Sequence, residues 1–355
     1  MTGLDYTQNR QAALAAFSKQ VGWCEILGSP FTAQVLTVIA EDIAADGTCA
    51  EIVSSWRGEP IVDALALRMA GALHALALMG SDDALVACFP PNPAAPREKL
   101  RSALLTVVRE HRTYIQTFLT SPPQTNEVGR SGVLLGGFLQ IAKETGLPLR
   151  PLEIGASAGL NTVWDRYHYQ LGGAEWGDGQ SAVRIAPDWR GALPPLDAPL
   201  RVIERGSCDL APVDLEDPAQ RLRLKAYVWA DQRERLLRLE GAIAEARAFG
   251  QKVDRADAAS WVRARLQTPA KASATVLFHS IMWQYLPAHT QADIAASLQK
   301  AGSQATKTAP LAWLRFEPPS ADSRPELRLT LWPSAREFCL AVAHPHGNSV
   351  EWSGM

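Results

Sequence analysis

The rhythm of the sequence changes at Leu147. Before it, from about residue 8 to 146, Ala- and Leu-rich segments carry apolar residues three and four positions apart, which is the spacing of helices that bury one face. After it, short apolar runs alternate with longer helical patterns. Strands and helices in alternation are typical of a wound α/β sheet with parallel strands. The sequence therefore predicts a helical N-terminal domain or lid, residues 1–146, followed by an α/β domain, residues 147–355.

Five apolar runs after Leu147 have the length and composition of buried strands. They are LRPLEIGA, LRVIERG, QKVDRADA, ATVLFHS and LAWLRFE. Two further runs, ELRLTLW and FCLAVAHP, flank a short PSAR turn and predict an antiparallel hairpin at one edge of the sheet. The Gly- and Pro-rich segment at about 170–199 is too long for a plain connection, and it predicts an inserted loop or a small hairpin flap.

The composition excludes several classes of protein. The 355 residues are 47% hydrophobic, and 35 basic against 37 acidic side chains leave a formal charge of −2, as in an ordinary globular protein with a buried core. Without a Lys/Arg cluster, no nucleic-acid partner is expected. The longest apolar stretch, IVDALALRMAGALHALALMG, contains Asp63, Arg68 and His74, so it predicts a buried helix and no membrane association. Because the N-terminus also lacks a secretory-signal pattern, we expect a cytoplasmic protein.

The segment LRPLEIGASAGLNTVWDRY carries the strongest functional signal. An apolar run reaches Glu153, turns through small residues and enters a helical pattern. Small residues at such a turn let a ligand approach the backbone closely, and a helix start offers amide groups and a positive dipole end to an anionic group. A tight β-to-α turn whose glycines serve packing alone is the alternative. The candidate cofactor-binding residues here are Glu153, Gly155, Ala156, Ser157 and Gly159.

Two chemistries compete for this turn. As E-x-G-x-x-x-G it resembles the first motif of class I S-adenosylmethionine-dependent methyltransferases, with Ser157 where many members carry a middle glycine. As G-x-S-x-G it matches the nucleophile elbow of α/β-hydrolases, which would make Ser157 the nucleophile. An elbow follows several strands, whereas the 146 residues before this turn predict helices, and this favours the methyltransferase. The other members of a hydrolase triad would come from Asp257, His279, His344 and His346.

Ligands of a wound sheet bind beyond the carboxyl ends of its strands. Glu204 closes the second run and is predicted to accept hydrogen bonds from the ribose hydroxyls of a cofactor, with a surface glutamate as the alternative. Asp257 closes the third run and is predicted to contact the adenine amino group, to cap the next helix, or both. His279 closes the fourth and is a candidate general base, with a histidine satisfied by backbone as the alternative. Trp283 and Tyr285 follow it as candidate substrate contacts.

The polar segment TSPPQTNEVGR lies between two apolar helical patterns just before the first strand. Its position predicts that Asn126 and Arg130 reach over the cofactor, with Arg130 pairing a carboxylate. The cysteines and histidines show no metal-ligand spacing, so we expect no metal site.

Several stretches together carry a wider resemblance. They are LRMAGALHALAL, PPQTNEVGR, LEIGASAGLN, DRYHY, YVWADQRERL, HSIMWQYLP and HPHG. The chain resembles, over nearly its full length, a widespread bacterial family of unknown function, and the resemblance implies a methyltransferase-like α/β domain behind a helical region. With the residues above, this predicts a Rossmann-like, mostly parallel sheet with an antiparallel C-terminal hairpin. The expected function is methyl transfer from S-adenosylmethionine to a small molecule. A serine hydrolase using Ser157 and a non-catalytic protein that binds an adenosyl ligand are the alternatives.

Overall fold

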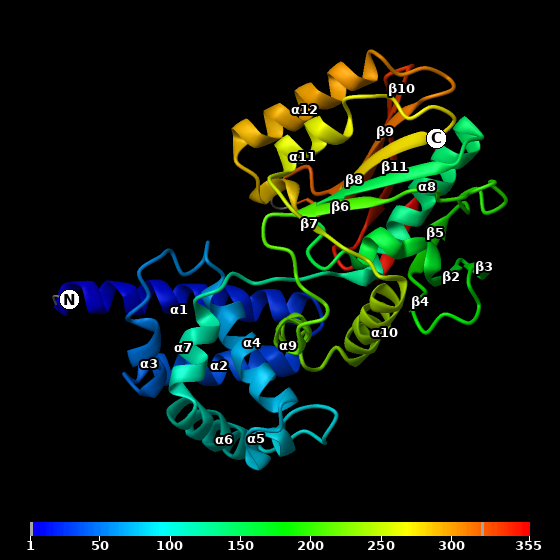
Figure 1. The fold of residues 1–355 in the computed structure, drawn as a ribbon. Coiled ribbons are helices and arrows are strands. Elements are labelled where there is room, and N and C mark those ends of the chain that lie inside the picture. The colour runs from blue at the N-terminus through cyan, green and yellow to red at the C-terminus, as the bar shows by residue number, and fades with distance from the viewer. Residues whose placement is uncertain (1–2, 321–322) are drawn as a thin grey trace. The chain divides into compact units, whose positions relative to one another are not determined.

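The structure is a computed structural model that describes residues 3–320 and 323–355. The chain forms two compact units, one of Met1–Thr125 with Asp217–Leu237 and one of Asn126–Glu216 with Arg238–Met355. The first is helical and the second contains the sheet (Figure 1). This division differs from the predicted boundary after residue 146, because residues 126–146 belong to the sheet unit and residues 217–237 to the helical unit.

The helical unit contains, among its described residues, helices of very different lengths. They are α1 (Gly3–Ile26), α2 (Pro30–Ala44), α3 (Thr48–Val53), α4 (Leu65–Leu78), α5 (Asp83–Cys88), α6 (Arg97–Glu110), α7 (Arg112–Leu119) and α9 (Pro218–Ala226). No strand occurs in residues 3–148, as the spacing of apolar residues in this region predicts.

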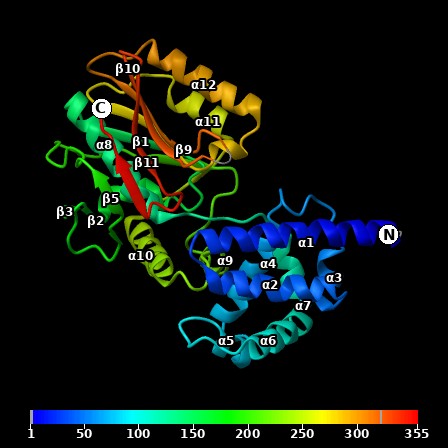
Figure 2. The same ribbon diagram turned by 180° about the vertical axis from the view of Figure 1, so that it is seen from behind.

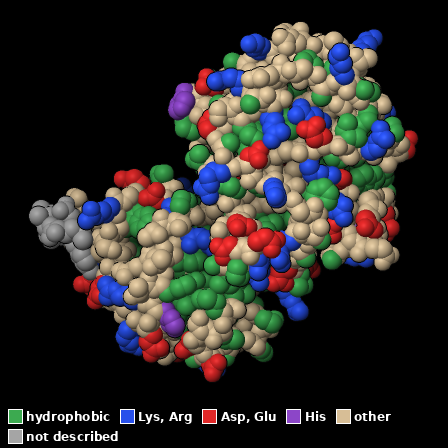
Figure 3. Space-filling model, viewed as in Figure 1, with side chains coloured by type: hydrophobic (Ala, Val, Ile, Leu, Met, Phe, Trp, Pro, Cys, Tyr) green, Lys and Arg blue, Asp and Glu red, His purple; other side chains and the backbone are tan. Residues whose placement is uncertain are grey.

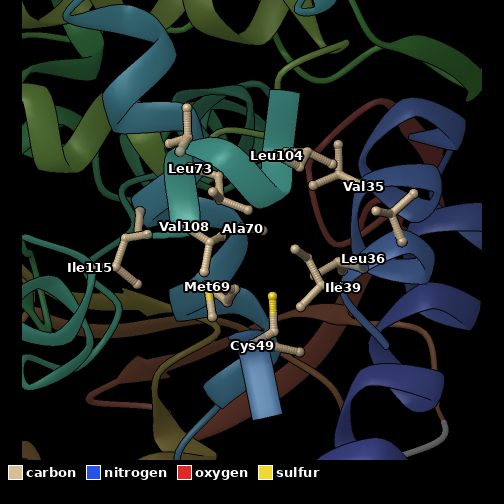
Figure 4. Close-up of a cluster of buried hydrophobic side chains, with 14 of the residues drawn as sticks. Val35, Leu36, Ile39, Cys49, Met69, Ala70, Leu73, Leu104, Val108 and Ile115 are labelled. Atoms are coloured by element: carbon tan, nitrogen blue, oxygen red, sulfur yellow. The ribbon is translucent and has the colours of Figure 1, made fainter. Parts of the chain in front are cut away.

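The core of the helical unit forms around α4, which is buried on almost every side, as its nearly all-apolar sequence predicts. Side chains from α2, α3, α6 and α7 pack against it (Figure 4). Arg68 is buried in this helix, and its guanidinium donates to the carbonyl oxygens of Asp63 and Leu119 at 2.7 Å each. These bonds compensate the cost of burying the charge.

His74 gives the helical unit a defined response to acid. It is 6% exposed on α4, and its Nδ1 lies 3.2 Å from the Ala226 carbonyl oxygen. Burial lowers its pKa from 6.5 to about 4. As the pH falls, His74 is therefore protonated in the unfolded chain before it is protonated in the folded protein. Its contribution to stability is complete above pH 6.5 and is lost between pH 6.5 and about 4. At about 1.4 kcal/mol for each pKa unit, the loss is about 3 kcal/mol.

We expect this loss to disappear in His74→Asn, which keeps a donor for the Ala226 carbonyl but does not titrate. The measurement is the free energy of unfolding of both proteins by urea between pH 4 and 7. An unchanged pH dependence in the variant would show that His74 does not carry the effect.

The apolar spacing of residues 218–249 is typical of one long helix, but the structure interrupts it. The segment forms α9 and α10 (Arg233–Phe249), and the residues between them serve the helical unit. Asp231 accepts hydrogen bonds from the Ser29 hydroxyl and from the Phe31 amide, the latter at 2.9 Å, at the start of α2. Gln232 donates to the Leu27 carbonyl at 3.0 Å. Two polar side chains thus hold this segment at a helix start, which periodicity alone does not reveal.

The sheet unit alternates strands and helices after α8. Its elements are η1 (Val128–Arg130), α8 (Ser131–Thr145), β1 (Leu149–Ile154), η2 (Leu160–Arg166), β2 (His168–Leu171), β3 (Ala174–Gly177), β4 (Arg184–Ile185), β5 (Asp188–Gly191), β6 (Gly206–Asp209), most of α10, β7 (Asp254–Arg255), α11 (Ala258–Arg265), β8 (Ala274–Ser280), η3 (Trp283–Tyr285), α12 (Ala288–Gly302), β9 (Leu311–Glu317), β10 (Glu326–Trp332), β11 (Arg336–Ala343) and β12 (Ser349–Trp352).

Within the described residues the main sheet has nine strands in the order β5-β12-β11-β10-β9-β8-β1-β6-β7. Strands β7, β6, β1, β8 and β9 are neighbours in this order, and each pairs in parallel with the next. Strands β10, β11 and β12 extend the sheet in antiparallel fashion. In order of appearance the parallel strands are arranged 3-2-1-4-5, so the order reverses between β1 and β8. The fold is therefore mixed α/β, with a large, mostly parallel sheet and a helical N-terminal region.

Helices cover both faces of this sheet (Figures 1 and 2). Helices α11 and α12 pack with Leu152, Leu277 and neighbouring residues on one face. Helix α8 lies on the other face, where the Phe138 ring meets Phe278 at a centroid distance of 5.1 Å. A Cβ added to Gly137 would lie 2.4 Å from Leu314, so only glycine lets α8 approach this closely.

The second strand is not the predicted LRVIERG. Ile203 in that run is 54% exposed, and Val202 forms only an isolated bridge with Leu149. Strand β6 is the following segment, Gly206–Asp209. Gly206 lies under Trp261, whose ring is 3.3 Å from the position of an added Cβ. Close packing thus selects small residues of low strand propensity over the β-branched run before them.

The insertion at about 170–199 contains the predicted hairpin, formed by β2 and β3. Strand β4 pairs in parallel with β2 to give a second sheet of three strands. Strand β5, also from this insertion, pairs in parallel with β12 at the edge of the main sheet, which the sequence pattern does not indicate.

No helix in the described residues is long and apolar enough to cross a membrane. On the face of the molecule in Figure 3, basic and acidic side chains are interspersed.

Candidate functional site

Polar side chains gather where β1, β6, β8 and β9 end. Glu153 precedes the last residue of β1, while Asp209, Ser280 and Glu317 are the last residues of β6, β8 and β9. These strands are neighbours and run in the same direction. The site therefore surrounds the point where the strand order reverses, which is where wound sheets bind ligands.

The turn after β1 is built on left-handed backbone. Gly155 has φ +64° and Gly159 has φ +72°. Ser157 between them has φ +52°, which is uncommon for a residue with a Cβ. Glycine at positions 155 and 159 therefore meets a conformational requirement, and the tight turn predicted from the sequence is present.

The amide groups of this turn are already engaged. Ser157 donates its backbone N–H to Asp209 Oδ2 at 2.8 Å. Ala158 and Leu160 donate theirs to Asn126 Oδ1 at 3.2 and 3.0 Å. The prediction that these amides receive an anionic group is wrong for this structure, because a carboxylate and an amide oxygen of the chain occupy them. Asn126 accordingly fixes the turn.

Glu153 is buried behind the turn, with 2% of its surface exposed. Its Oε2 accepts a hydrogen bond from the Thr162 hydroxyl. Burial raises the pKa of this carboxyl to about 8; the Thr162 hydrogen bond and the Arg130 charge oppose the rise, and the Asp209 carboxylate adds to it. Glu153 is therefore a carboxyl group that can change charge near neutral pH, next to the turn.

Asp209, and not the predicted Glu204, is the last residue of the second parallel strand. The Glu204 side chain is 53% exposed and pairs with Arg150 at 3.1 Å, before β6 begins. The structure therefore does not place Glu204 at the end of the second strand, and its exposure agrees with the surface-glutamate alternative. Asp209 lies at the correct strand end, and its Oδ1 also accepts the Ala211 amide at 2.9 Å.

Asp257 follows β7 by two residues and caps α11. Its Oδ1 accepts the Ser260 amide at 2.9 Å. The helix-capping role predicted for Asp257 is confirmed. The residue is exposed, and its second carboxylate oxygen makes no hydrogen bond with another described residue.

His279 is fully buried at the end of β8, and both ring nitrogens are engaged. The Trp313 indole N–H donates to Nε2 at 3.0 Å, and Nδ1 lies 2.7 Å from Glu317 Oε1. Since an indole nitrogen only donates, Nε2 must be the acceptor and Nδ1 carries the proton donated to Glu317. The predicted general base is incompatible with this arrangement, because the Nε2 lone pair is already used. His279 positions Glu317 instead.

Glu317 and Met282 complete the site, and sequence reasoning missed both. Glu317 Oε1 also accepts the Met282 amide at 3.1 Å. The Met282 side chain packs on the turn after β1, where a Cβ added to Gly155 would lie 2.7 Å from Met282 Cε. Met282 thus connects the turn to the end of β9. Glu317 closes the run LAWLRFE as Glu153 nearly closes its own, so the same strand-end signal could have found it.

Arg130 connects two other segments of the site. Its Nε donates to the Pro345 carbonyl and its Nη1 to the Ser280 carbonyl, both at 3.0 Å. It therefore holds the HPHG turn at the end of β8. Of the predicted substrate contacts, Trp283 stacks on His279 with ring centroids 5.0 Å apart, while Tyr285 is 76% exposed.

The hydrolase triad of Ser157, Asp257 and His279 is not assembled. Asp257 caps α11, and His279 donates to Glu317, so the aspartate and histidine do not meet. Within residues 3–320 and 323–355, no group of three or more His, Cys, Asp and Glu side chains is arranged to hold a metal ion.

A model of a protein family matches residues 14–352 of the chain. The chain belongs to this family, DUF2332, described as uncharacterized proteins conserved in bacteria. Searches of curated proteins and of solved structures found no match. Membership thus identifies relatives of this chain without assigning them an activity, and the function has to be inferred from the site itself.

Proposed function

We propose that this member of DUF2332 is an S-adenosylmethionine-dependent methyltransferase that acts on a small molecule. The observation that carries the proposal is the series of acidic residues at the ends of β1, β6 and β7. Glu153, Asp209 and Asp257 follow one another along three neighbouring parallel strands, starting where the strand order reverses. A Rossmann-like sheet with acceptors in this order suits a ligand rich in hydroxyl and ammonium donors.

The engaged amides of the turn argue against a dinucleotide. Pyrophosphate is bound by backbone amides at a helix start, and here Asp209 and Asn126 already accept the amides of Ser157, Ala158 and Leu160. S-adenosylmethionine has no phosphate, and its ammonium and sulfonium charges outweigh its single carboxylate. A site bordered by carboxylates therefore complements this donor better than it complements NAD or FAD.

The residues present fit such a donor. Each oxygen of Asp209 accepts one backbone amide and retains a second lone pair, which would receive a ribose hydroxyl. Asp257 would take the adenine amino group with its second oxygen, and Glu153 would accept a hydrogen bond from the ammonium group. When bound, S-adenosylmethionine supplies an electrophilic methyl group.

The remaining task of the protein is to align donor and acceptor. Orientation alone provides effective molarities of about 10⁵ to 10⁸ M, so methyl transfer requires no strong acid or metal ion. The rigid parts of the site suit this task, because Arg130 holds the end of β8 and His279 holds Glu317 at the end of β9.

Isothermal titration tests the proposal. We expect S-adenosylmethionine and S-adenosylhomocysteine to bind the purified protein and NAD⁺ not to bind. If neither adenosyl compound binds, the proposal is wrong. If both bind but no S-adenosylhomocysteine is released in the presence of a broad metabolite extract, the non-catalytic adenosyl-binding protein becomes the better description.

One observation favours the serine hydrolase as a second candidate. Ser157 has φ +52° in a strand-to-helix turn, as a nucleophile elbow requires. A fluorophosphonate probe tests it directly, because labelling that is lost in Ser157→Ala would establish the hydrolase and exclude the methyltransferase as the main function.

A further inference from the structure

The two oxygens of the Glu317 carboxylate differ in their hydrogen bonding within the described residues. Oε1 accepts two N–H groups, from His279 Nδ1 at 2.7 Å and from Met282 at 3.1 Å. Oε2 is buried and has no hydrogen-bond partner among the described residues. Leaving a buried acceptor unpaired costs about 1–3 kcal/mol, and more when the group is charged. The unpaired Oε2 therefore destabilises the protein when no ligand is bound, and a ligand that donates a hydrogen bond to Oε2 would remove this cost.

The missing partner is a cation. The Glu317 side chain is 12% exposed, and no Lys or Arg of the described residues lies within 4.0 Å of it. The imidazole that contacts it is a neutral donor, since its Nε2 accepts the Trp313 indole N–H. Buried carboxylates are normally paired with a positive charge. An organic ammonium group would supply both the charge and the N–H donor that Oε2 lacks.

The surroundings of His279, which holds Glu317, are aromatic. Trp283 and Trp313 lie with ring centroids 5.5 Å apart at 56° and both contact the His279 ring. Trp283 is half-buried, with one face of its indole on the imidazole. Tryptophan faces attract cations more strongly than other aromatic rings do. The Arg315 guanidinium already lies over Trp313, 4.1 Å from the ring centroid, so Trp283 is the indole that favours the same class of ligand as the Glu317 carboxylate.

The segment that donates to Glu317 is strained. Ile281 has φ +48°, which is a genuine outlier for a β-branched residue, and Met282 follows it. Strain of about 1–3 kcal/mol at such a residue typically occurs at ligand-binding segments. The next residues, Trp283–Tyr285, end in the exposed side chain of Tyr285. The strained backbone lies directly against the carboxylate, because Ile281 donates its amide to the Phe316 carbonyl of β9 and Met282 donates its amide to Glu317 Oε1.

We propose that Glu317, held by His279 in a cluster that includes Trp283 and Trp313, binds an organic amine. The reaction of this amine rests on the proposed function, in which it would be the methyl acceptor. Its binding does not, and binding can be measured without any methyl donor.

The test uses the full-length protein with benzylamine and N-methylbenzylamine, and with benzyl alcohol as the neutral isostere. Binding is followed by isothermal titration and by tryptophan fluorescence, with no S-adenosylmethionine present. We expect both amines to bind and Glu317→Gln to weaken their binding at least tenfold, because the charge is lost. Binding of the alcohol should be weak in both proteins.

Glu351→Gln is the matched control, since Glu351 lies on β12, is half-exposed and pairs with Arg324. It should bind the amines like the wild type. The glutamine at 317 keeps an oxygen for His279 and Met282, and an unchanged unfolding midpoint would verify the fold. Equal affinity for amine and alcohol, equal affinity of Glu317→Gln and wild type, or no amine binding at millimolar concentration would each overturn the inference. Amine binding without S-adenosylmethionine binding would instead overturn only the methyltransferase.

Discussion

Asp209→Asn is expected to weaken the binding of S-adenosylmethionine about ten- to a hundredfold. Hydrogen bonds to charged groups contribute about 1.5–3 kcal/mol, and Asp209 supplies the carboxylate at the end of β6. Asparagine retains a single acceptor, so it cannot satisfy the Ser157 and Ala211 amides together and also receive a ribose hydroxyl. Isothermal titration of wild type and variant measures the effect, with circular dichroism to verify the fold.

Glu204→Gln is the control for this substitution, because the two residues represent competing assignments of one role. Glu204 is exposed and pairs with Arg150 ahead of β6, so its neutral variant should bind the donor as the wild type does. Weaker binding by Glu204→Gln together with normal binding by Asp209→Asn would restore the assignment made from the sequence.

Trp164→Ala should destabilise the sheet unit by about 3–5 kcal/mol, the range for truncating large buried aromatic side chains. Trp164 lies in η2 directly after the glycine turn and is fully buried. It stacks on Phe138 of α8 at a centroid distance of 4.1 Å and an interplanar angle of 9°, and Trp176 covers it at 6.0 Å. Urea unfolding followed by circular dichroism measures the change.

Trp164→Phe separates the role of the ring from that of the indole N–H. Nε1 of Trp164 is buried and has no hydrogen-bond partner among the described residues, so phenylalanine removes an unsatisfied donor while retaining a stacked ring. We expect this variant to lose far less stability than Trp164→Ala. Equal losses would show that the indole N–H, and not the stacking, supports the structure.

The parts of the fold that follow from side-chain periodicity could be predicted. The run ELRLTLW coincides with β10, and ATVLFHS coincides with β8, because strands in the body of this sheet select continuous or alternating apolar residues. Strand β6 escaped prediction because it begins with Gly206, which packs closely beneath Trp261 and lacks the apolar side chain that marks a strand. The interruption between α9 and α10 was not predicted. It depends on Asp231 and Gln232, which form hydrogen bonds with Phe31 and Leu27, about 200 residues earlier in the chain.

The candidate site was predictable as a location but only partly as chemistry. Strand-end residues such as Glu153 and His279 do lie at the reversal of strand order. Their roles depend on partners that no local pattern reveals. His279 is engaged by Trp313 and Glu317 from β9, and the turn amides by Asn126 and Asp209. Glu204 was expected at a strand end because the second strand was placed a few residues ahead of β6.

The return of residues 217–237 to the helical unit has a consequence for how the chain acquires its structure during synthesis. Asp231 and Gln232 contact the segment that joins α1 to α2, yet they are translated after β1 and β6. The N-terminal helices therefore leave the ribosome about a hundred residues before their last partners do, and must wait, incompletely packed, while the first strands of the other unit emerge. No single proteolytic cut can release either unit whole, because the backbone passes from one to the other after residues 125, 216 and 237.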